Sequence, residues 1–182
     1  EEAERLNRMV KNVLDMTRLE SGAIKIKKEL QSLEEIVGVV LNRLGDRLND
    51  HPLTLNIPGN LPFISADGLL LEQVFMNLFE NAIKYTPKGT PLELSAFEAH
   101  HLVTLELADR GPGIPPGEEE RIFEKFVHGG GVGGGVGLGL AVCRAIIVAH
   151  GGKIWAENRS GGGAAFRSTL PAVVMPPLPK EE

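Results

Sequence analysis

Two asparagines and a lysine lie on one face of a predicted helix and could hold a metal-bound polyphosphate. Asn77, Asn81 and Lys84 follow one another at spacings of four and three residues, which places them in one stripe along a helix. Asparagine is a poor residue inside a helix because its amide competes for main-chain hydrogen bonds. Amide oxygens can ligate a hard cation such as Mg²⁺, and a lysine can meet phosphate oxygens. A solvated helix face would explain the same spacing equally well.

The helix that must position this stripe is predicted over residues 69–86. Its apolar residues recur at spacings of three and four and form a core face: Leu71, Val74, Phe75, Leu78 and Ala82. Asp67 is placed to cap its N-terminus, and Thr86-Pro87-Lys88-Gly89 ends it.

A second candidate site follows a predicted strand over 102–108. In Asp109-Arg110-Gly111-Pro112-Gly113-Ile114, a carboxylate stands at the strand end, and two glycines let the main chain approach a flat ligand closely. A plain turn would explain this segment equally well.

Glycine is concentrated between residues 129 and 139, where eight of eleven residues are glycine. This run leads into a helix predicted over 140–149. Such a segment can cradle phosphate, because amides point out of the helix end and the helix dipole favours anions. A disordered loop is the alternative, and the two are compatible. The run lies too late in the chain for a Rossmann fingerprint, and Gly152-Lys153-Ile154 excludes a Walker A loop.

Composition limits the class of protein. The 182 residues, 42% of them hydrophobic, suit one domain with an appendage. A formal net charge of −5 without a long basic run argues against a nucleic-acid partner. The single Cys143 excludes an internal disulfide and fits a small buried apolar residue. No long apolar stretch or signal peptide occurs, so membrane attachment is expected only through segments outside this chain.

The remaining elements are predicted from periodicity. A helix over 1–20 has an apolar seam flanked by charges and should pack on a partner helix. Ile24 and Ile26 indicate an edge strand, and residues 115–126 a short helix with Ile122, Phe123 and Phe126 facing inward. A further helix is predicted over 33–48, further strands over 53–57, 92–98, 153–158 and 165–170, and a disordered tail after residue 171.

The order of these motifs resembles the ATP-binding domain of bacterial sensor histidine kinases, of the GHKL superfamily. The matching segments are the asparagine box Asn77–Thr86, the first glycine box Asp109–Gly113, the phenylalanine box Phe123–Phe126, the glycines of Gly135–Leu140 and the last glycine box Gly161–Phe166. The resemblance covers about residues 1–171. Within the family, Arg110–Phe126 and Gly137–Arg159 look most like the KdpD-type potassium-responsive sensor kinases.

The resemblance implies a fold and a division of the chain. The fold would be an α/β two-layer sandwich, with a mixed sheet of about five strands packed on about three helices. Residues 1–22 would be the second helix of a dimerisation and histidine-phosphotransfer hairpin. Residues 23–171 would be the ATP-binding catalytic domain, and residues 172–182 the tail.

The resemblance also implies roles for the site residues. Asn81, helped by Asn77, would hold Mg²⁺ on the triphosphate, and Lys84 and Tyr85 would contact phosphate or ribose. Asp109 would accept a hydrogen bond from the exocyclic amine of adenine. The remaining ATP-binding residues would shape the pocket wall or bind phosphate through their amides: Gly111, Gly113, Ile114, Gly135, Gly137, Leu138, Gly139 and Leu140.

The implied reaction moves the γ-phosphoryl group of Mg-ATP to a histidine and then to a response-regulator aspartate. None of the five histidines has the setting of the family's phosphoacceptor, so that helix and its acidic neighbour are expected to be absent from this chain. No catalytic residue is therefore assigned. The implied partners are the protein's own phosphoacceptor helix, a homodimer partner and a receiver domain. This part would be cytoplasmic, and the whole protein would lie in the bacterial inner membrane.

Two other functions stay open at this stage. A GHKL ATPase of the gyrase, MutL or chaperone kind carries a glutamate four residues before the metal-binding asparagine, but Asn77 stands there. The second is a nucleotide-free interaction module. It is favoured by the short glycine-rich lid at residues 127–134, which lacks the arginine that the family often has after the phenylalanine box. The last glycine box also departs from the family, with Ala164 where threonine is common, which bears on the packing there.

Overall fold

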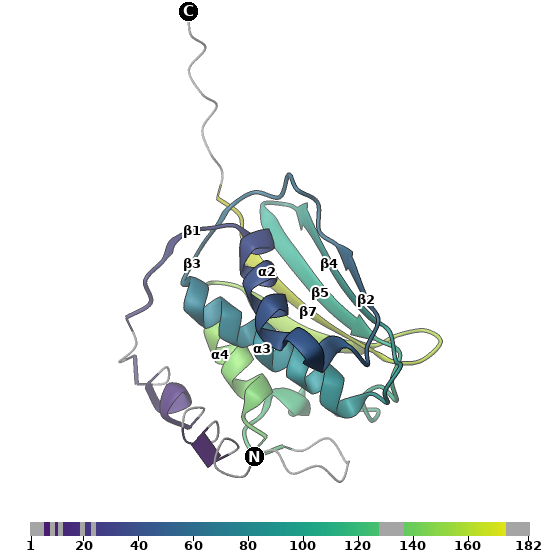
Figure 1. Cartoon of the computed structure of the whole chain (residues 1–182). Helices are drawn as coiled ribbons and strands as arrows, with labels where there is room; N and C mark the ends of the chain where they lie inside the picture. Colours follow the sequence, from purple (N-terminus) through teal and green to yellow (C-terminus); the bar gives the residue numbers. More distant parts are fainter. Residues whose placement is uncertain are drawn as a thin grey trace, which may run out of the picture.

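Within residues 25–127 and 137–173, a five-stranded sheet is covered on one face by three helices (Figure 1). The structure, a computed structural model, describes residues 6–7, 10, 13–18, 21–22, 25–127 and 137–173. β2 runs parallel to β4, and the other neighbouring strands are antiparallel. The predicted two-layer α/β sandwich with a mixed sheet is therefore confirmed. The strand order is β2 (Leu53–Asn56), β4 (Leu92–Ala99), β5 (Leu102–Asp109), β7 (Ala164–Pro171) and β6 (Lys153–Asn158).

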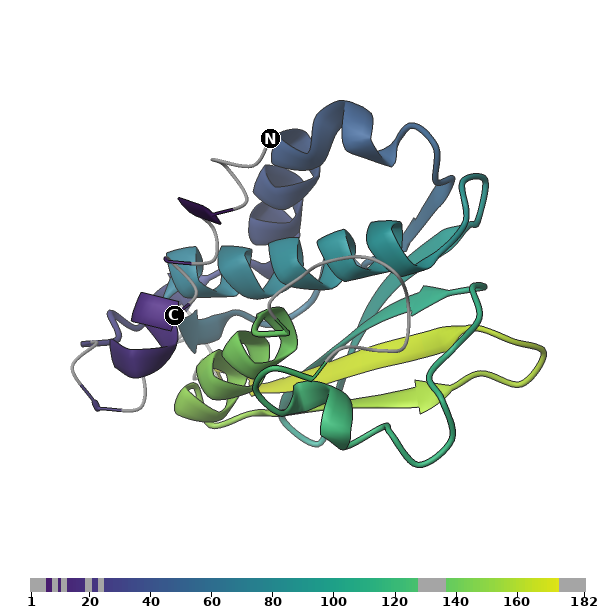
Figure 2. The ribbon, with the colours of Figure 1, turned by 90° about the horizontal axis from the view of Figure 1, so that it is seen from below.

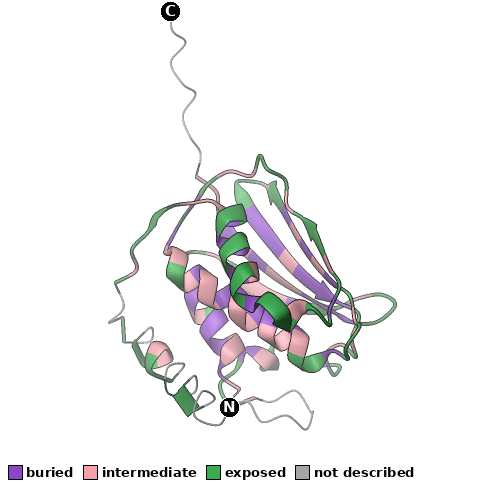
Figure 3. Ribbon diagram, viewed as in Figure 1, coloured by how far each residue is buried: buried purple, intermediate pink, exposed green. Residues whose placement is uncertain are grey.

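The three helices α2 (Leu33–Leu44), α3 (Gly68–Tyr85) and α4 (Gly139–Ala149) form the second layer (Figure 2). α3 lies between the other two and begins as predicted, because Asp67 Oδ1 accepts a hydrogen bond from the Leu70 amide at 3.3 Å. All five residues predicted for its core face are buried. The buried faces of the helices and the sheet meet between the two layers, while the outer side of α2 is exposed (Figure 3).

A second, smaller hydrophobic cluster lies beside the main core. It joins the segment after β5 to the β6–β7 hairpin through Ile114, Phe123, Ala156 and Ala164. Leu140, in the first turn of α4, packs against both clusters. The start of α4 and the segment after β5 are thus positioned by shared apolar contacts.

The predicted edge strand at Ile24–Ile26 is wrong in its position. Ile24 lies outside the described residues, and the strand is β1 (Glu29–Gln31), which pairs antiparallel with β3 (Ile64–Ala66). The sequence did not predict β3, because three residues are too few to show a period. β3 ends directly before Asp67, the N-cap of α3. Because β1 pairs with β3, β1 also lies beside the start of α3.

Two predicted helices are shorter than their sequence patterns. The helix over 33–48 ends at Leu44, because Gly45 takes a φ of 47°, and the 3₁₀ turn η1 (Gly45–Leu48) follows. The helix over 115–126 is wrong, and only the 3₁₀ turn η2 (Arg121–Phe123) forms. Phe123 is buried and Ile122 partly buried, but Phe126 has a φ of 63° and is 62% exposed, so it does not face inward.

The N-terminal helix predicted over 1–20 is helical wherever it is described. Met16 packs against the main core, and Gln73 Nε2 on α3 donates to Asp15 Oδ2 at 3.1 Å. The apolar side chains of Leu6, Val10 and Leu14 are exposed. The predicted tail lies outside the described residues from 174 onward, and the predicted domain boundaries stay predictions.

Candidate functional site

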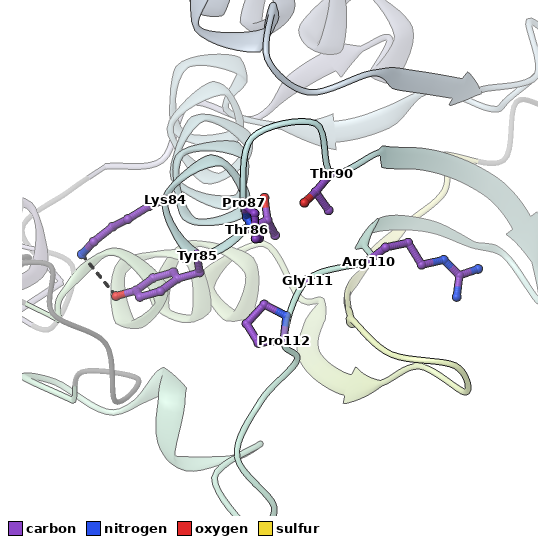
Figure 4. Close-up of a pocket in the computed structure, with 8 residues that line it drawn as sticks. All are labelled: Lys84, Tyr85, Thr86, Pro87, Thr90, Arg110, Gly111 and Pro112. Carbon is purple, nitrogen blue, oxygen red and sulfur yellow. Dashed lines mark hydrogen bonds between the residues drawn. The ribbon is translucent and has the colours of Figure 1, made fainter.

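A cavity of about 500 Å³ opens where the end of α3 meets the segment after β5 (Figure 4). Lys84 Nζ donates to the Tyr85 hydroxyl at 3.2 Å and lies 4.8 Å from the centre of the Tyr85 ring. Arg110 lies at the other end of the cavity. The Arg110 side chain points away from Tyr85, and its Nη1 donates to Ser160 O at 3.4 Å. An exposed aromatic ring with the Lys84 cation beside it suits a flat anionic ligand. The cavity is lined by Lys84, Tyr85, Thr86, Pro87, Thr90, Arg110, Gly111 and Pro112.

Asp109 is a buried carboxylate at the end of β5, and one of its oxygens is hydrogen-bonded within the protein. Its Oδ1 accepts hydrogen bonds from the amides of Gly111 at 2.8 Å and Ala164 at 3.2 Å. Oδ2 has no hydrogen-bond partner in the described part of the chain. The arrangement fixes the carboxylate and leaves one oxygen able to accept a hydrogen bond from a ligand.

Gly111 is required by a close approach to α3. A Cβ atom there would lie 2.7 Å from Thr86 Cγ2, and Thr86 is itself buried. The Thr86 hydroxyl donates to Ala82 O at 2.7 Å. In the sequence, Thr86 is only a helix stop and the last residue of the asparagine box, because nothing local shows which residue a distant glycine will face.

The asparagine stripe reaches the start of α4. Asn77 Nδ2 donates to Gly139 O at 3.3 Å, and both asparagines of the stripe are partly buried. The Asn81 side chain makes no hydrogen bond within residues 25–127 and 137–173. Asn77 therefore lies against the first turn of α4, and Asn81 follows one helical turn further along α3 on the same face.

The first turn of α4 has no side-chain cap, so its free amides point outward toward solvent or a ligand. Gly137 takes a φ of 68°, and a Cβ there would lie 2.5 Å from Val127 O. The Phe126 amide donates to Gly137 O at 2.9 Å, which joins the two ends of the segment 128–136. Gly135, another predicted site residue, lies outside the described residues.

The predicted site residues thus fall into three connected groups rather than one lined cavity. Lys84, Tyr85 and Gly111 line the cavity, and Asp109 is hydrogen-bonded to Gly111. Gly113 and Ile114 continue the segment after β5, Ile114 being buried. Asn77 and Asn81 share α3 with the cavity residues and meet Gly137–Leu140 through Gly139.

The site's chemistry is that of binding rather than of an activated nucleophile. Burial raises the pKa of the Cys143 thiol to about 12, so it stays protonated at neutral pH. His51 and His150 are buried and hydrogen-bonded to main-chain groups. No cluster of three or more His, Cys, Asp or Glu side chains that could hold a metal occurs among the described residues.

The donor set beside α4 still fits one kind of metal ion. Two amide oxygens from one helix supply part of an oxygen shell, and phosphate oxygens and water could supply the rest, as Mg²⁺ prefers.

Nothing in the described part of the chain is long and apolar enough to form a membrane-crossing helix.

Known sequences match nearly the whole chain. The family of histidine kinase-, DNA gyrase B-, and HSP90-like ATPases matches residues 66–174. Sensor protein KdpD of Escherichia coli (strain K12) is 46% identical over 173 residues, which are 94% of this chain and 19% of the relative. KdpD of Clostridium acetobutylicum is 39% identical over 175 residues, with the same shares. The chain therefore spans about a fifth of the length of these relatives.

Solved structures match the fold over a similar range. Full-length ShkA in complex with AMPPNP superposes with a TM-score of 0.83 at 31% identity, covering 95% of this chain and 37% of that one. Acinetobacter baumannii histidine kinase AdeS gives 0.80 at 28% identity, with 93% and 80% covered. Histidine kinase ThkA in complex with the response regulator protein TrrA gives 0.77 at 26% identity, with 94% and 48% covered.

Proposed function

The chain belongs to the family of histidine kinase-, DNA gyrase B- and HSP90-like ATPases, and on that premise we propose that it is the ATP-binding catalytic part of a KdpD-type sensor histidine kinase. The hydrogen bond from Asn77 to Gly139 carries the proposal. It holds Asn77 against the uncapped start of α4, with Asn81 one turn further along α3, so that amide side chains and free main-chain amides are close enough to hold a cation and a polyphosphate together.

In this proposal ATP lies across the three groups of residues. Asp109 Oδ2 accepts from the exocyclic amine of adenine, with Gly111, Gly113 and Ile114 as the wall. Lys84 and Tyr85 contact phosphate or ribose. Asn81 and Asn77 hold Mg²⁺, which neutralises phosphate charge. The amides of Gly137, Leu138, Gly139 and Leu140, together with Gly135, bind phosphate.

The reaction proposed is phosphoryl transfer. The bond between the γ-phosphorus and the β–γ bridging oxygen breaks, and a bond to a histidine nitrogen on the phosphoacceptor helix forms. The phosphoryl group then passes to an aspartate of a response regulator. The residues of this chain position the nucleotide and neutralise its charge, which is the main protein contribution to phosphoryl transfer.

The partners proposed are the protein's own phosphoacceptor helix, a homodimer partner and a receiver domain. ThkA is known in complex with a response regulator, which supports the last of these. Residues 1–22 would belong to the dimerisation hairpin and residues 23–171 to the catalytic domain. The whole protein would lie in the bacterial inner membrane with this part in the cytoplasm.

The gyrase-like ATPase is disfavoured by the side chain at the position of its general base. Asn77 carries no titratable group, and its amide donates to Gly139 O. It therefore cannot take a proton from an attacking water.

The test is calorimetric titration with AMPPNP, with and without Mg²⁺, on this chain and on Asn81→Ala. Asn56→Ala is the matched control, because Asn56 is exposed on β2. Binding should need Mg²⁺, be lost in Asn81→Ala and persist in Asn56→Ala. No binding to the unaltered chain at millimolar nucleotide would overturn the proposal and favour an interaction module.

A further inference from the structure

We propose that Asn158, at the end of β6, is a positioning residue that fixes the Gly113–Ile114 wall of the nucleotide site. The inference rests on the proposed function and adds a residue to it. Figure 2 shows the β6–β7 hairpin, drawn in yellow-green, beside the segment that follows β5.

One side-chain amide holds both main-chain polar groups of Ile114. Asn158 Oδ1 accepts from the Ile114 amide at 2.7 Å, and Asn158 Nδ2 donates to Ile114 O at 2.8 Å. The side chain therefore pairs with Ile114 as a neighbouring strand would. Ile114 is only 8% exposed, and its main chain has no other hydrogen-bond partner in the described residues. Buried main-chain groups need hydrogen-bond partners. These two hydrogen bonds, here called the Asn158 clamp, therefore decide where Ile114 lies.

Gly113, the residue before Ile114, leaves room for the Asn158 side chain. Gly113 takes a φ of 77°, and a Cβ atom there would lie 2.6 Å from Asn158 Oδ1. Glycine is thus the residue that allows both this conformation and this approach of the Asn158 amide.

The clamp and the adenine-accepting carboxylate share one support. Asn158 and Ala164 are cross-strand partners in the β6–β7 hairpin, and the Ala164 amide donates to Asp109 Oδ1 at 3.2 Å. One residue pair therefore sets both the Asp109 carboxylate and the Ile114 wall. The distance between the Asp109 carboxylate and the Ile114 wall is the width available to a flat base.

The ligand part that depends on Asn158 is therefore the base and not the phosphates. The phosphate-binding amides belong to α4, which Asn158 does not contact through any hydrogen bond in the described residues. Leu140 of α4 meets Ile114 only through the shared apolar cluster, so removing the clamp should weaken binding of a nucleotide more than binding of an inorganic polyphosphate.

The experiment compares the unaltered chain, Asn158→Ala and the control Asn56→Ala. Affinities are measured for Mg-AMPPNP and for Mg-tripolyphosphate, together with amide hydrogen exchange at Ile114 without ligand. Asn158→Ala should weaken AMPPNP about tenfold, weaken tripolyphosphate clearly less and speed exchange at Ile114. Asn158→Asp keeps the acceptor for the Ile114 amide but removes the donor to Ile114 O. Its AMPPNP affinity should therefore lie between those of the unaltered chain and Asn158→Ala.

Equal loss of both ligands in Asn158→Ala, or unchanged AMPPNP affinity and Ile114 exchange, would overturn the positioning role while leaving the proposed function intact. Failure of the unaltered chain to bind AMPPNP would overturn the proposed function, and the positioning role with it.

Discussion

Asn77 on α3 donates a hydrogen bond from its side chain to the main-chain oxygen of Gly139, at the start of α4. Two more contacts join the same helices further along. Cys143 Sγ donates to Val74 O at 3.6 Å, and the Asp67 amide donates to His150 Nε2 at 3.0 Å. The two helices therefore run in opposite directions, and both ends of α4 are held against the first half of α3. The position of the asparagine stripe relative to the start of α4 depends on these contacts.

Asn77 and Asn81 should differ in their effects on folding. Asn77→Ala removes the contact to Gly139 and should lower the free energy of unfolding by about 1 kcal/mol, while also weakening Mg-AMPPNP. Asn81→Ala should leave stability nearly unchanged, because Asn81 makes no hydrogen bond in the described residues. Urea unfolding and calorimetry on both variants measure this difference, and equal stabilities would contradict it.

His150 should be a major support of α3. Its Nδ1 donates to Ile146 O at 2.8 Å, which leaves Nε2 as the acceptor for the Asp67 amide. His150→Ala leaves a cavity and an unpaired amide and should cost about 2–4 kcal/mol in urea unfolding. Val148→Ala, on the exposed side of the same helix, should cost less than about 0.5 kcal/mol. A His150→Ala cost as small as this control's would rule out the supporting role.

Gly111 and Thr86 should be energetically coupled. Gly111→Ala places a Cβ against Thr86 Cγ2 and should cost about 1–3 kcal/mol. Thr86→Ser removes that methyl group and keeps the hydroxyl that bonds Ala82 O. The double variant should therefore lose less than the sum of the single losses by at least about 1 kcal/mol in a double-mutant cycle. Additive losses would mean that the two residues do not meet.

Asp109 should have separable structural and ligand-binding roles. Asp109→Ala leaves the Gly111 and Ala164 amides without their acceptor and should destabilise by about 1–3 kcal/mol. Asp109→Asn keeps an acceptor for these amides but puts an NH₂ group where the adenine amine would donate. It should keep most of the stability and lose most of the AMPPNP affinity. Retained affinity in Asp109→Asn would exclude the proposed adenine contact.

Cys143 should make stability fall at alkaline pH. Burial raises its pKa from 9.0 to about 12, so the folded state holds its proton after the unfolded state has released it. Its contribution is complete below pH 9 and is lost as pH rises toward 12, at about 1.4 kcal/mol per pH unit. Urea unfolding between pH 8 and about 10.5 should show a steeper fall in the unaltered chain than in Cys143→Ala. Parallel curves would contradict this expectation.

Periodicity in the sequence determined the main helices and strands. α3 begins at the predicted cap and buries the predicted face, since an 18-residue amphipathic pattern has only one way to bury its apolar side. The strands predicted over 92–98 and 102–108 form as β4 and β5. Short elements were not determined in this way. β3 has three residues, and the segment 115–126 has a helical apolar spacing that Gly117, with a φ of 84°, and the extended Glu124 interrupt.

The sequence alone also predicted the kind of site, because asparagine spacing and glycine runs are local patterns. Tertiary structure decided which residues hold that site in place. The partners Asn77–Gly139, Thr86–Gly111 and Asn158–Ile114 are separated by 62, 25 and 44 residues in the chain. No local pattern encodes such pairs. They meet because the sheet places β7 between β5 and β6, because α3 packs on β5, and because α4 packs antiparallel on α3.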